Sequence, residues 1–166
     1  MILNLKQVIE NPDIILNFKH QFDLSSLEFW GSRLINEPVE ISGAVKNHLS
    51  IISLTANINV KLEPLCALCN KKITINKEIP LDYLLVDHVA DDVDNRIEIA
   101  NGTIDLDEIV ETAVILNVEM RYLCKQDCKG LCQICGADLN ENPCTCGGNK
   151  HIDPRLSNLA DLLNKE

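Results

Sequence analysis

Strict alternation of apolar and polar residues constrains the fold of this chain more than any other feature. From Ile52 to Leu62 every second residue is apolar without a break, and a second run extends from Ile73 to Leu85 with only Lys77 out of pattern. A shorter run, from Val39 to Lys46, follows the same rule. Period-two patterns are typical of strands with one buried and one solvated face. They predict at least three strands of an antiparallel sheet, which tolerates a wet face.

A capped amphipathic helix follows the predicted strands. The segment Asp105-Leu-Asp-Glu108 fits a capping box that begins with aspartate. Apolar residues then recur at the i, i+3, i+4 and i+7 positions of one helical face, at Leu106, Ile109, Val110 and Ala113. We expect a helix over about 105–117 that packs on the sheet. The predicted fold class is α+β, an antiparallel β-sheet with a packed amphipathic helix and a C-terminal cysteine-rich zinc-binding segment.

The first forty residues contain weaker signals. Leu5, Val8 and Ile9 predict a short helical turn, and Ile14–Phe18 predicts a strand. We expect the single tryptophan, Trp30, to anchor the core near a turn rather than to form a base-stacking platform.

Cysteine spacing indicates metal binding. Six of the eight cysteines follow the pattern C-x3-C-x3-C-x2-C-x8-C-x-C over residues 124–146, and Cys132-Gln-Ile-Cys135-Gly136 has the form of a zinc knuckle. The remaining pair, Cys66 and Cys69, lies at the tip of the hairpin between the two long predicted strands. Eight thiolates at these spacings are enough for one or two structural Zn²⁺ sites. The candidate ligands are Cys66, Cys69, Cys124, Cys128, Cys132, Cys135, Cys144 and Cys146.

The division of these ligands between two ions stays open at this point. We expect Cys132, Cys135, Cys144 and Cys146 to form one set, which leaves Cys124 and Cys128 to join Cys66 and Cys69. Cys128 could replace Cys144 in the first set if the C-x-C spacing disfavours two bonds to one ion. His151 ranks behind the cysteines as a ligand.

Other uses of the cysteines are less favoured. Disulfide frameworks belong to small secreted domains, whereas this chain opens with MILNLKQVIE, which lacks the features of a secretory signal. Thioredoxin-like chemistry needs a cysteine at a helix N-terminus after a strand, and neither Cys132 nor Cys66 is placed so by the pattern. No apolar run approaches the roughly 20 residues of a membrane span. We therefore expect a cytoplasmic protein without membrane contact.

The same signals suggest two parts. Residues 1–122 are expected to form the sheet scaffold with its helix, and residues 123–166 the zinc segment with a short terminal helix. Asp153 and Pro154 suit the start of that helix, whose apolar stripe would comprise Leu156, Leu159, Ala160 and Leu163.

Charge limits the partners that the chain can bind. Residues 1–120 contain 9 Lys and Arg against 19 Asp and Glu, whereas residues 121–166 contain 6 of each. Nucleic-acid binders generally carry a basic footprint, so tight unassisted RNA binding is disfavoured. The only basic focus comprises Lys71, Lys72, Lys125 and Lys129, which could contact RNA or only offset thiolate charge. An acidic sheet could instead bind a basic protein.

The cysteine segment resembles the YceD family, the large ribosomal RNA subunit accumulation proteins. The resemblance is carried by Cys128-Lys-Gly-Leu-Cys132-Gln-Ile-Cys135-Gly-Ala-Asp-Leu-Asn140, by Cys144-Thr-Cys146 and by Ile152-Asp-Pro-Arg-Leu156. It covers roughly residues 40–160. Leu68 stands where the family often has arginine, and Ile134 precedes Cys135, but neither departure removes a ligand.

This resemblance implies a non-enzymatic factor in large ribosomal subunit biogenesis that supports accumulation of 23S ribosomal RNA. Its partners would be ribosomal RNA or a basic ribosomal or assembly protein, with no small-molecule substrate. The alternative is a zinc- or thiol-dependent enzyme that acts on RNA or a redox partner. Against it, His20, His48, His88 and His151 stand apart from any catalytic motif.

Overall fold

The structure is a computed structural model that describes residues 1–12, 14–88 and 95–148. The helix expected from Asp153 and the candidate ligand His151 lie outside these residues. The described chain divides into two compact units. Unit 1 comprises Met1–Leu65 and Lys72–Tyr122, and unit 2 comprises Cys66–Lys71 and the chain from Leu123 onward.

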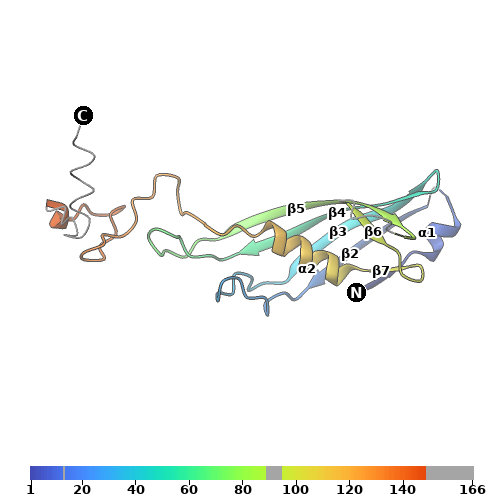
Figure 1. The fold of residues 1–166 in the computed structure, drawn as a ribbon, viewed down its shortest axis with the longest axis horizontal. Helices are drawn as coiled ribbons and strands as arrows, with labels where there is room; N and C mark the ends of the chain where they lie inside the picture. The colour runs from blue at the N-terminus through green and yellow to red at the C-terminus, as the bar shows by residue number, and fades with distance from the viewer. Residues whose placement is uncertain (13, 89–94, 149–166) are drawn as a thin grey trace, which may run out of the picture. The chain divides into compact units, whose positions relative to one another are not determined.

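Unit 1 is a five-stranded sheet with two helices and a small second sheet (Figure 1). The large sheet has the strand order β2-β3-β4-β5-β6, and β1 pairs with β7. The helices are α1 (Lys6–Glu10) and α2 (Leu106–Asn117). The strands are β1 (Ile2–Asn4), β2 (Ile15–Phe22), β3 (Val39–His48), β4 (Ile51–Leu62), β5 (Ile75–Val86), β6 (Arg96–Glu98) and β7 (Thr103–Asp105).

The long strands pair as the alternation predicts. Antiparallel pairing of β2 with β3, β3 with β4 and β4 with β5 confirms the antiparallel sheet. The sheet as a whole is mixed, because the short strand β6, which the alternation did not predict, joins β5 in parallel. The β1–β7 pair was not expected from sequence, since strands of three residues are too short to show a period.

The buried face of the large sheet forms the centre of the hydrophobic core. In β4, Ile58 has no exposed surface, and its neighbours across the ladder are Ile41 in β3 and Ile79 in β5. Asn57, the preceding residue, is exposed on the other face. The core therefore depends on the register of these three strands, since a slip by one residue would exchange the two faces.

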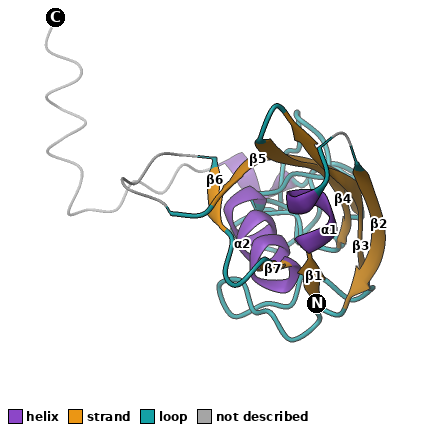
Figure 2. Cartoon of the chain, turned by 90° about the vertical axis from the view of Figure 1, so that its right-hand side faces the viewer, coloured by secondary structure: helices purple, strands orange, loops and turns teal. Residues whose placement is uncertain are grey.

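Both helices contribute to the same buried cluster. Val8 of α1 and Leu106, Val110 and Val114 of α2 are fully buried and belong to the cluster that contains the sheet residues. Figure 2 shows α1 and α2 on the concave side of the curved sheet. The predicted N-cap is confirmed, because the Asp105 carboxylate accepts the backbone N–H of Asp107 at 3.0 Å.

The expectation for Trp30 is wrong. Its side chain is 61% exposed, whereas the adjacent Phe29 is only 8% exposed and belongs to the core. The backbone N–H and C=O groups of Phe29 and Ser32 hydrogen-bond to each other at 2.8 and 3.0 Å, which places Trp30 and Gly31 at the tip of a two-residue turn. Phe29 therefore takes the core position expected of its neighbour.

Gly43 permits an unusually close approach of β3 to β4. A Cβ atom at this position would lie 2.4 Å from the Cβ of Ala56 and 2.4 Å from the carbonyl oxygen of Thr55. We expect Gly43→Val to lower the free energy of unfolding by about 1–3 kcal/mol, because the strands must separate to admit the side chain. Chemical denaturation measures this loss.

The matched control is Ser42→Val, at an exposed position that pairs with Asn57 in the same ladder. Its free energy of unfolding should change by less than about 0.5 kcal/mol. Equal losses in the two variants would contradict the close approach at Gly43.

Candidate metal centres

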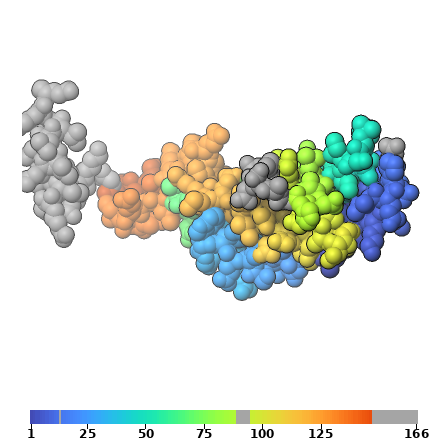
Figure 3. All heavy atoms as spheres, turned by 45° about the vertical axis from the view of Figure 1, so that its right-hand side comes forward, coloured from blue at the N-terminus to red at the C-terminus, as the bar shows by residue number. Residues whose placement is uncertain are grey.

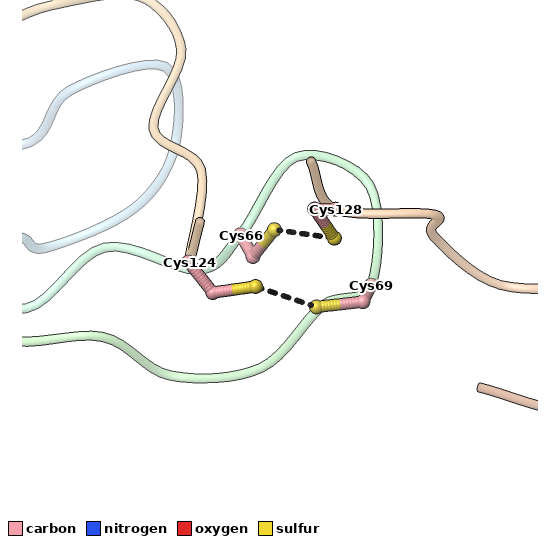
Figure 4. A group of neighbouring side chains, drawn as sticks. All are labelled: Cys66, Cys69, Cys124 and Cys128. Carbon is pink, nitrogen blue, oxygen red and sulfur yellow. Dashed lines mark hydrogen bonds between the residues drawn. The ribbon is translucent and has the colours of Figure 1, made fainter. Parts of the chain in front are cut away.

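The first cysteine pair lies in a tight turn at the tip of the β4–β5 hairpin. The backbone N–H of Cys66 donates to the carbonyl of Lys71 at 2.8 Å, and the N–H of Asn70 donates to the carbonyl of Cys66 at 2.9 Å. Asn70 has a φ of 59°, a left-handed conformation that asparagine tolerates better than most residues. The turn brings Cys66 and Cys69 to one side of the chain (Figure 4).

The second pair repeats this geometry. The N–H of Cys132 donates to the carbonyl of Ala137 at 2.8 Å, and the N–H of Gly136 donates to the carbonyl of Cys132 at 2.9 Å. Gly136 has a φ of 72°, as expected of the glycine after the knuckle. Asn70 is the counterpart of Gly136, and sequence reasoning missed it because only the glycine form of the knuckle was considered.

Four cysteines come together around the hairpin tip, and we call them site 1: Cys66, Cys69, Cys124 and Cys128. Their sulfur atoms all lie within 4.8 Å of one another, with 3.8 Å between Cys66 and Cys128 and 3.6 Å between Cys69 and Cys124 (Figure 4). These distances exceed the S–S bond of about 2.05 Å of a disulfide. Sulfurs at about 2.3 Å from a tetrahedral ion would be separated by about 3.8 Å. Site 1 therefore has the size of a closed four-thiolate metal site.

The other four cysteines form site 2: Cys132, Cys135, Cys144 and Cys146. Their sulfurs also lie within 4.8 Å of one another. The two sites differ in exposure. In site 1, Cys124 is exposed and the other three cysteines are buried, whereas in site 2 Cys135 is exposed and the other three are partly exposed. Cys128 lies in site 1, so it does not stand in for Cys144 in this arrangement. Both groups could hold a metal ion, and ligation by these eight residues stays a prediction.

Each site has one acidic thiol. Backbone N–H groups lower the pKa of Cys66 to about 6, with Cys69 as the main donor, and those of Cys135 and Ile134 lower the pKa of Cys132 to about 6. The thiols of Cys124 and Cys146 are harder to ionise. Desolvation and neighbouring thiols raise the pKa of Cys124 to about 12, and the adjacent Cys135 raises that of Cys146 to about 11. A cation among the sulfurs would remove this mutual repulsion and let all four ionise.

This asymmetry predicts selective alkylation of the metal-free protein. Because the pKa of Cys132 is about 6, its thiolate fraction should rise with pH and saturate above about pH 7. Its rate of reaction with iodoacetamide should follow that curve, whereas Cys146, with a pKa of about 11, should react slowly throughout. Mass spectrometry of peptides measures both rates. A common midpoint near about pH 8.5, the value of a free thiol, would contradict the folded geometry.

Polar residues outside the cysteines support site 1 within unit 2. The amide of Asn140 donates to the sulfur of Cys128 at 3.4 Å, and its carbonyl oxygen accepts the backbone N–H of Lys129 at 2.9 Å. The Asp138 carboxylate accepts the amide of Asn140 at 2.7 Å and contacts the ammonium of Lys71 at 3.1 Å. Such partners orient metal ligands. The chain between Cys135 and Cys144 therefore also supports site 1.

The two turns approach each other closely. The N–H of Leu131 donates to the carbonyl of Leu68 at 3.1 Å, and a Cβ atom on Gly130 would lie 3.0 Å from the same oxygen. Gly130 has a φ of 74°, so a glycine is needed for both conformation and space. Sequence reasoning missed Gly130, Asp138 and Asn140 as supporting residues, although all three lie in the segment that carries the family resemblance.

The four candidate lysines have different surroundings. Lys71 contacts Asp138 and also Glu141, at 2.7 Å, which raises its pKa. Lys72 belongs to unit 1 and contacts Glu63 at 2.7 Å. Among the described residues, the ammonium groups of Lys125 and Lys129 have no ion-pair partner. Binding of RNA or a partner by these lysines stays a prediction.

Comparison with known proteins identifies the family. The sequence model of the large ribosomal RNA subunit accumulation protein YceD matches residues 54–163 of this chain, which include all eight cysteines. The chain belongs to the YceD family. Within the described residues, no helix is long and apolar enough to cross a membrane.

Curated relatives of this YceD-family chain come from bacteria and a plant. Uncharacterised proteins of Mycobacterium bovis and Mycobacterium tuberculosis are each 32% identical over 108 residues, which is 61% of this chain and 50% of theirs. A chloroplastic large ribosomal RNA subunit accumulation protein, YCED homolog 1 of Arabidopsis thaliana, is 39% identical over 66 residues, 38% of this chain and 20% of that protein. The chain thus spans at most half the length of these relatives. No solved structure matches it.

Proposed function

We propose that this protein is a non-enzymatic factor in large ribosomal subunit biogenesis that supports accumulation of large-subunit ribosomal RNA. Membership of the YceD family supports this role, because the family is named for it. The Arabidopsis relative has the same description. The protein would work in the cytoplasm as an adaptor, with unit 2 stabilised by zinc.

Zn²⁺ is the ion that best fits the two cysteine sites. Four thiolates suit a soft or borderline ion in tetrahedral geometry, and a site closed by four protein ligands is typical of structural zinc. The sulfur separations of 3.6 and 3.8 Å in site 1 carry this assignment. Because four protein thiolates leave no open coordination position, the same geometry argues against a catalytic metal.

The partner of the adaptor would be a basic protein, ribosomal RNA or both. Residues 1–120 carry more than twice as many acidic as basic residues, which favours a cationic partner. Among the residues of unit 2 that the structure describes, Lys125 and Lys129 are the basic groups without an ion pair and are available for a phosphate. Basic ribosomal or assembly proteins suit the acidic sheet better than RNA does.

A depletion experiment in the organism that encodes the protein tests this function. We expect loss of the protein to lower the ratio of 23S to 16S ribosomal RNA and of 50S to 30S particles, measured by RNA electrophoresis and sucrose gradients. Expression of the unaltered chain should restore both ratios, and so should the control Asn57→Asp, which changes an exposed residue in unit 1.

Cysteine variants distinguish an adaptor stabilised by zinc from a thiol-dependent enzyme. Cys66→Ser with Cys69→Ser, and Cys132→Ser with Cys135→Ser, should each fail to restore the ratios. Single replacement of the acidic thiol Cys132 by histidine, another zinc ligand, should retain part of the function if zinc is structural. An unchanged 23S to 16S ratio after depletion would overturn the proposed function.

A further inference from the structure

Trp30 is presented to solvent at an energetic cost. It has a φ of 50°, a left-handed conformation that is rare for a bulky residue, and its side chain is 61% exposed. Two-residue turns of this kind favour Asn or Gly at the first position. Burial of the indole therefore does not explain the choice of residue, and neither does the conformation of the turn.

The two-residue turn that carries Trp30 is rigid. Two backbone hydrogen bonds between Phe29 and Ser32 close the turn, and Phe29 fixes it to the core. The guanidinium of Arg33 contacts the carboxylate of Glu28 at 3.3 Å on either side of the turn. Farther along, Ile35 is fully buried and bridges to Leu62 of β4. The turn thus holds the backbone of Trp30 in one conformation at the surface of unit 1, which favours a preorganised contact.

The loop that carries Trp30 is long but ordered. It extends over residues 23–38 between β2 and β3 without a regular helix or strand, and Figure 3 shows its light-blue atoms at the surface of unit 1. Loops longer than about 12–15 residues in compact domains are often binding loops. Exposed aromatic residues on rigid supports are frequent anchors of protein interfaces, with tryptophan the most enriched.

Charge indicates the kind of partner. The loop contains Asp23, Glu28 and Glu37 against the single cation Arg33. Arg33 pairs with Glu28 and Lys61 of β4 pairs with Glu37, so the acidic excess comes chiefly from residues 1–120 as a whole, which are strongly acidic. Such a surface repels the phosphates of RNA and attracts cationic side chains. An indole face also binds Lys or Arg directly through the cation–π interaction.

We infer that Trp30 is the anchor of a docking surface for a basic protein, with the indole packed against a Lys or Arg side chain of that partner. The inference deepens the proposed function, on which it rests for the choice of a basic partner. It concerns unit 1 alone, so its test needs neither zinc nor ribosomal RNA.

Fluorescence gives a direct test, because Trp30 is the only tryptophan in the chain. The full chain is titrated with three probes of equal length: a peptide of alternating arginine and glycine, the same peptide with glutamate for arginine, and oligouridylate. We expect only the arginine peptide to change the emission. Binding of that peptide without a change in the indole emission would place the peptide on another acidic surface and would overturn the inference. An equal change with oligouridylate or the glutamate peptide would overturn the inference.

Variants at Trp30, assayed by anisotropy of the labelled arginine peptide, identify the interaction. Trp30→Phe should keep affinity within about threefold, because a ring face remains, whereas Trp30→Leu should weaken binding about tenfold. Equal binding of the leucine variant and the unaltered chain would overturn the cation–π contact.

Asparagine replacement separates binding from stability. Trp30→Asn should raise the Tm by about 2–4 °C, because asparagine tolerates the turn conformation, while abolishing the contact. The matched control is Leu49→Asn, at an exposed position with a φ of 52° in the β3–β4 turn, which should raise the Tm without affecting peptide binding. A lower Tm for Trp30→Asn would show that Trp30 has a structural role, and equal loss of binding in the control would contradict a specific surface.

Discussion

A Cys66→Ser, Cys69→Ser double variant is expected to hold about one equivalent of zinc, and the unaltered protein is expected to hold about two. The two serines remove half of the ligands of site 1 and leave site 2 intact. Elemental analysis of protein purified without chelator measures the ratio. Because structural zinc contributes about 10–16 kcal/mol of apparent binding free energy in small domains, unit 2 should also lose protection in hydrogen exchange.

Two further variants make this result specific. Cys132→Ser with Cys135→Ser should likewise remove one equivalent, this time from site 2. Ala67→Ser, at an exposed position inside the first knuckle, should leave both equivalents bound. Less than half an equivalent in the unaltered protein, with the thiols oxidised in pairs, would rule out zinc at both sites.

Ile58→Asp is expected to cost several kcal/mol of stability in unit 1, which is enough to unfold many single domains. Ile58 is fully buried at the centre of β4, between Ile41 and Ile79, so an aspartate there has no polar partner among its cross-strand neighbours. Thermal and chemical denaturation followed by circular dichroism measure the loss.

The adjacent residue provides the control. Asn57→Asp introduces the same charge on the exposed face of the same strand, opposite Ser42 and Pro80. Its stability should change by less than about 0.5 kcal/mol. If Ile58→Asp and Asn57→Asp lowered the stability equally, the assignment of Ile58 to the buried face of the sheet would be wrong.

Sequence predicted the long strands because their environment is uniform along their length. Every second side chain of β4 from Leu54 to Leu62 is buried, so one physical cause repeats at each step and the period is clear. The capped helix α2 was predictable for the same reason, since Asp105 and the apolar face that follows act locally.

Local features that depend on a single contact or turn could not be predicted from the sequence pattern. The turn between β3 and β4 places Leu49 and Ser50 at φ values of 52° and 65°, although neither residue favours them. Strand twist selects this turn for a two-residue connection and overrides the local preference. Trp30 escaped for a related reason, since hydropathy cannot tell which of two adjacent aromatic residues enters the core.

The candidate metal sites were predictable in their residues but not in their support. Cysteine spacing alone identified the two C-x-x-C pairs, because such a ligand pair must lie within one turn of the chain. In contrast, Asp138 and Lys71 are far apart in sequence, and nothing in the spacing indicates their contact at 3.1 Å. Asn70 replaces the usual glycine, so its role emerged only from its φ of 59°.

The order of the site 1 ligands along the chain makes a metal ion there a cross-link. Cys66 and Cys69 precede β5, β6, β7 and α2, whereas Cys124 and Cys128 follow them, so an ion at site 1 closes a ring that contains all four elements. A protease that cuts this ring once, anywhere from Lys72 to Leu123, would produce two polypeptides still held together by four thiolates. A chelator would remove this link and leave only the strand pairing and the buried core of unit 1 to hold the two pieces together.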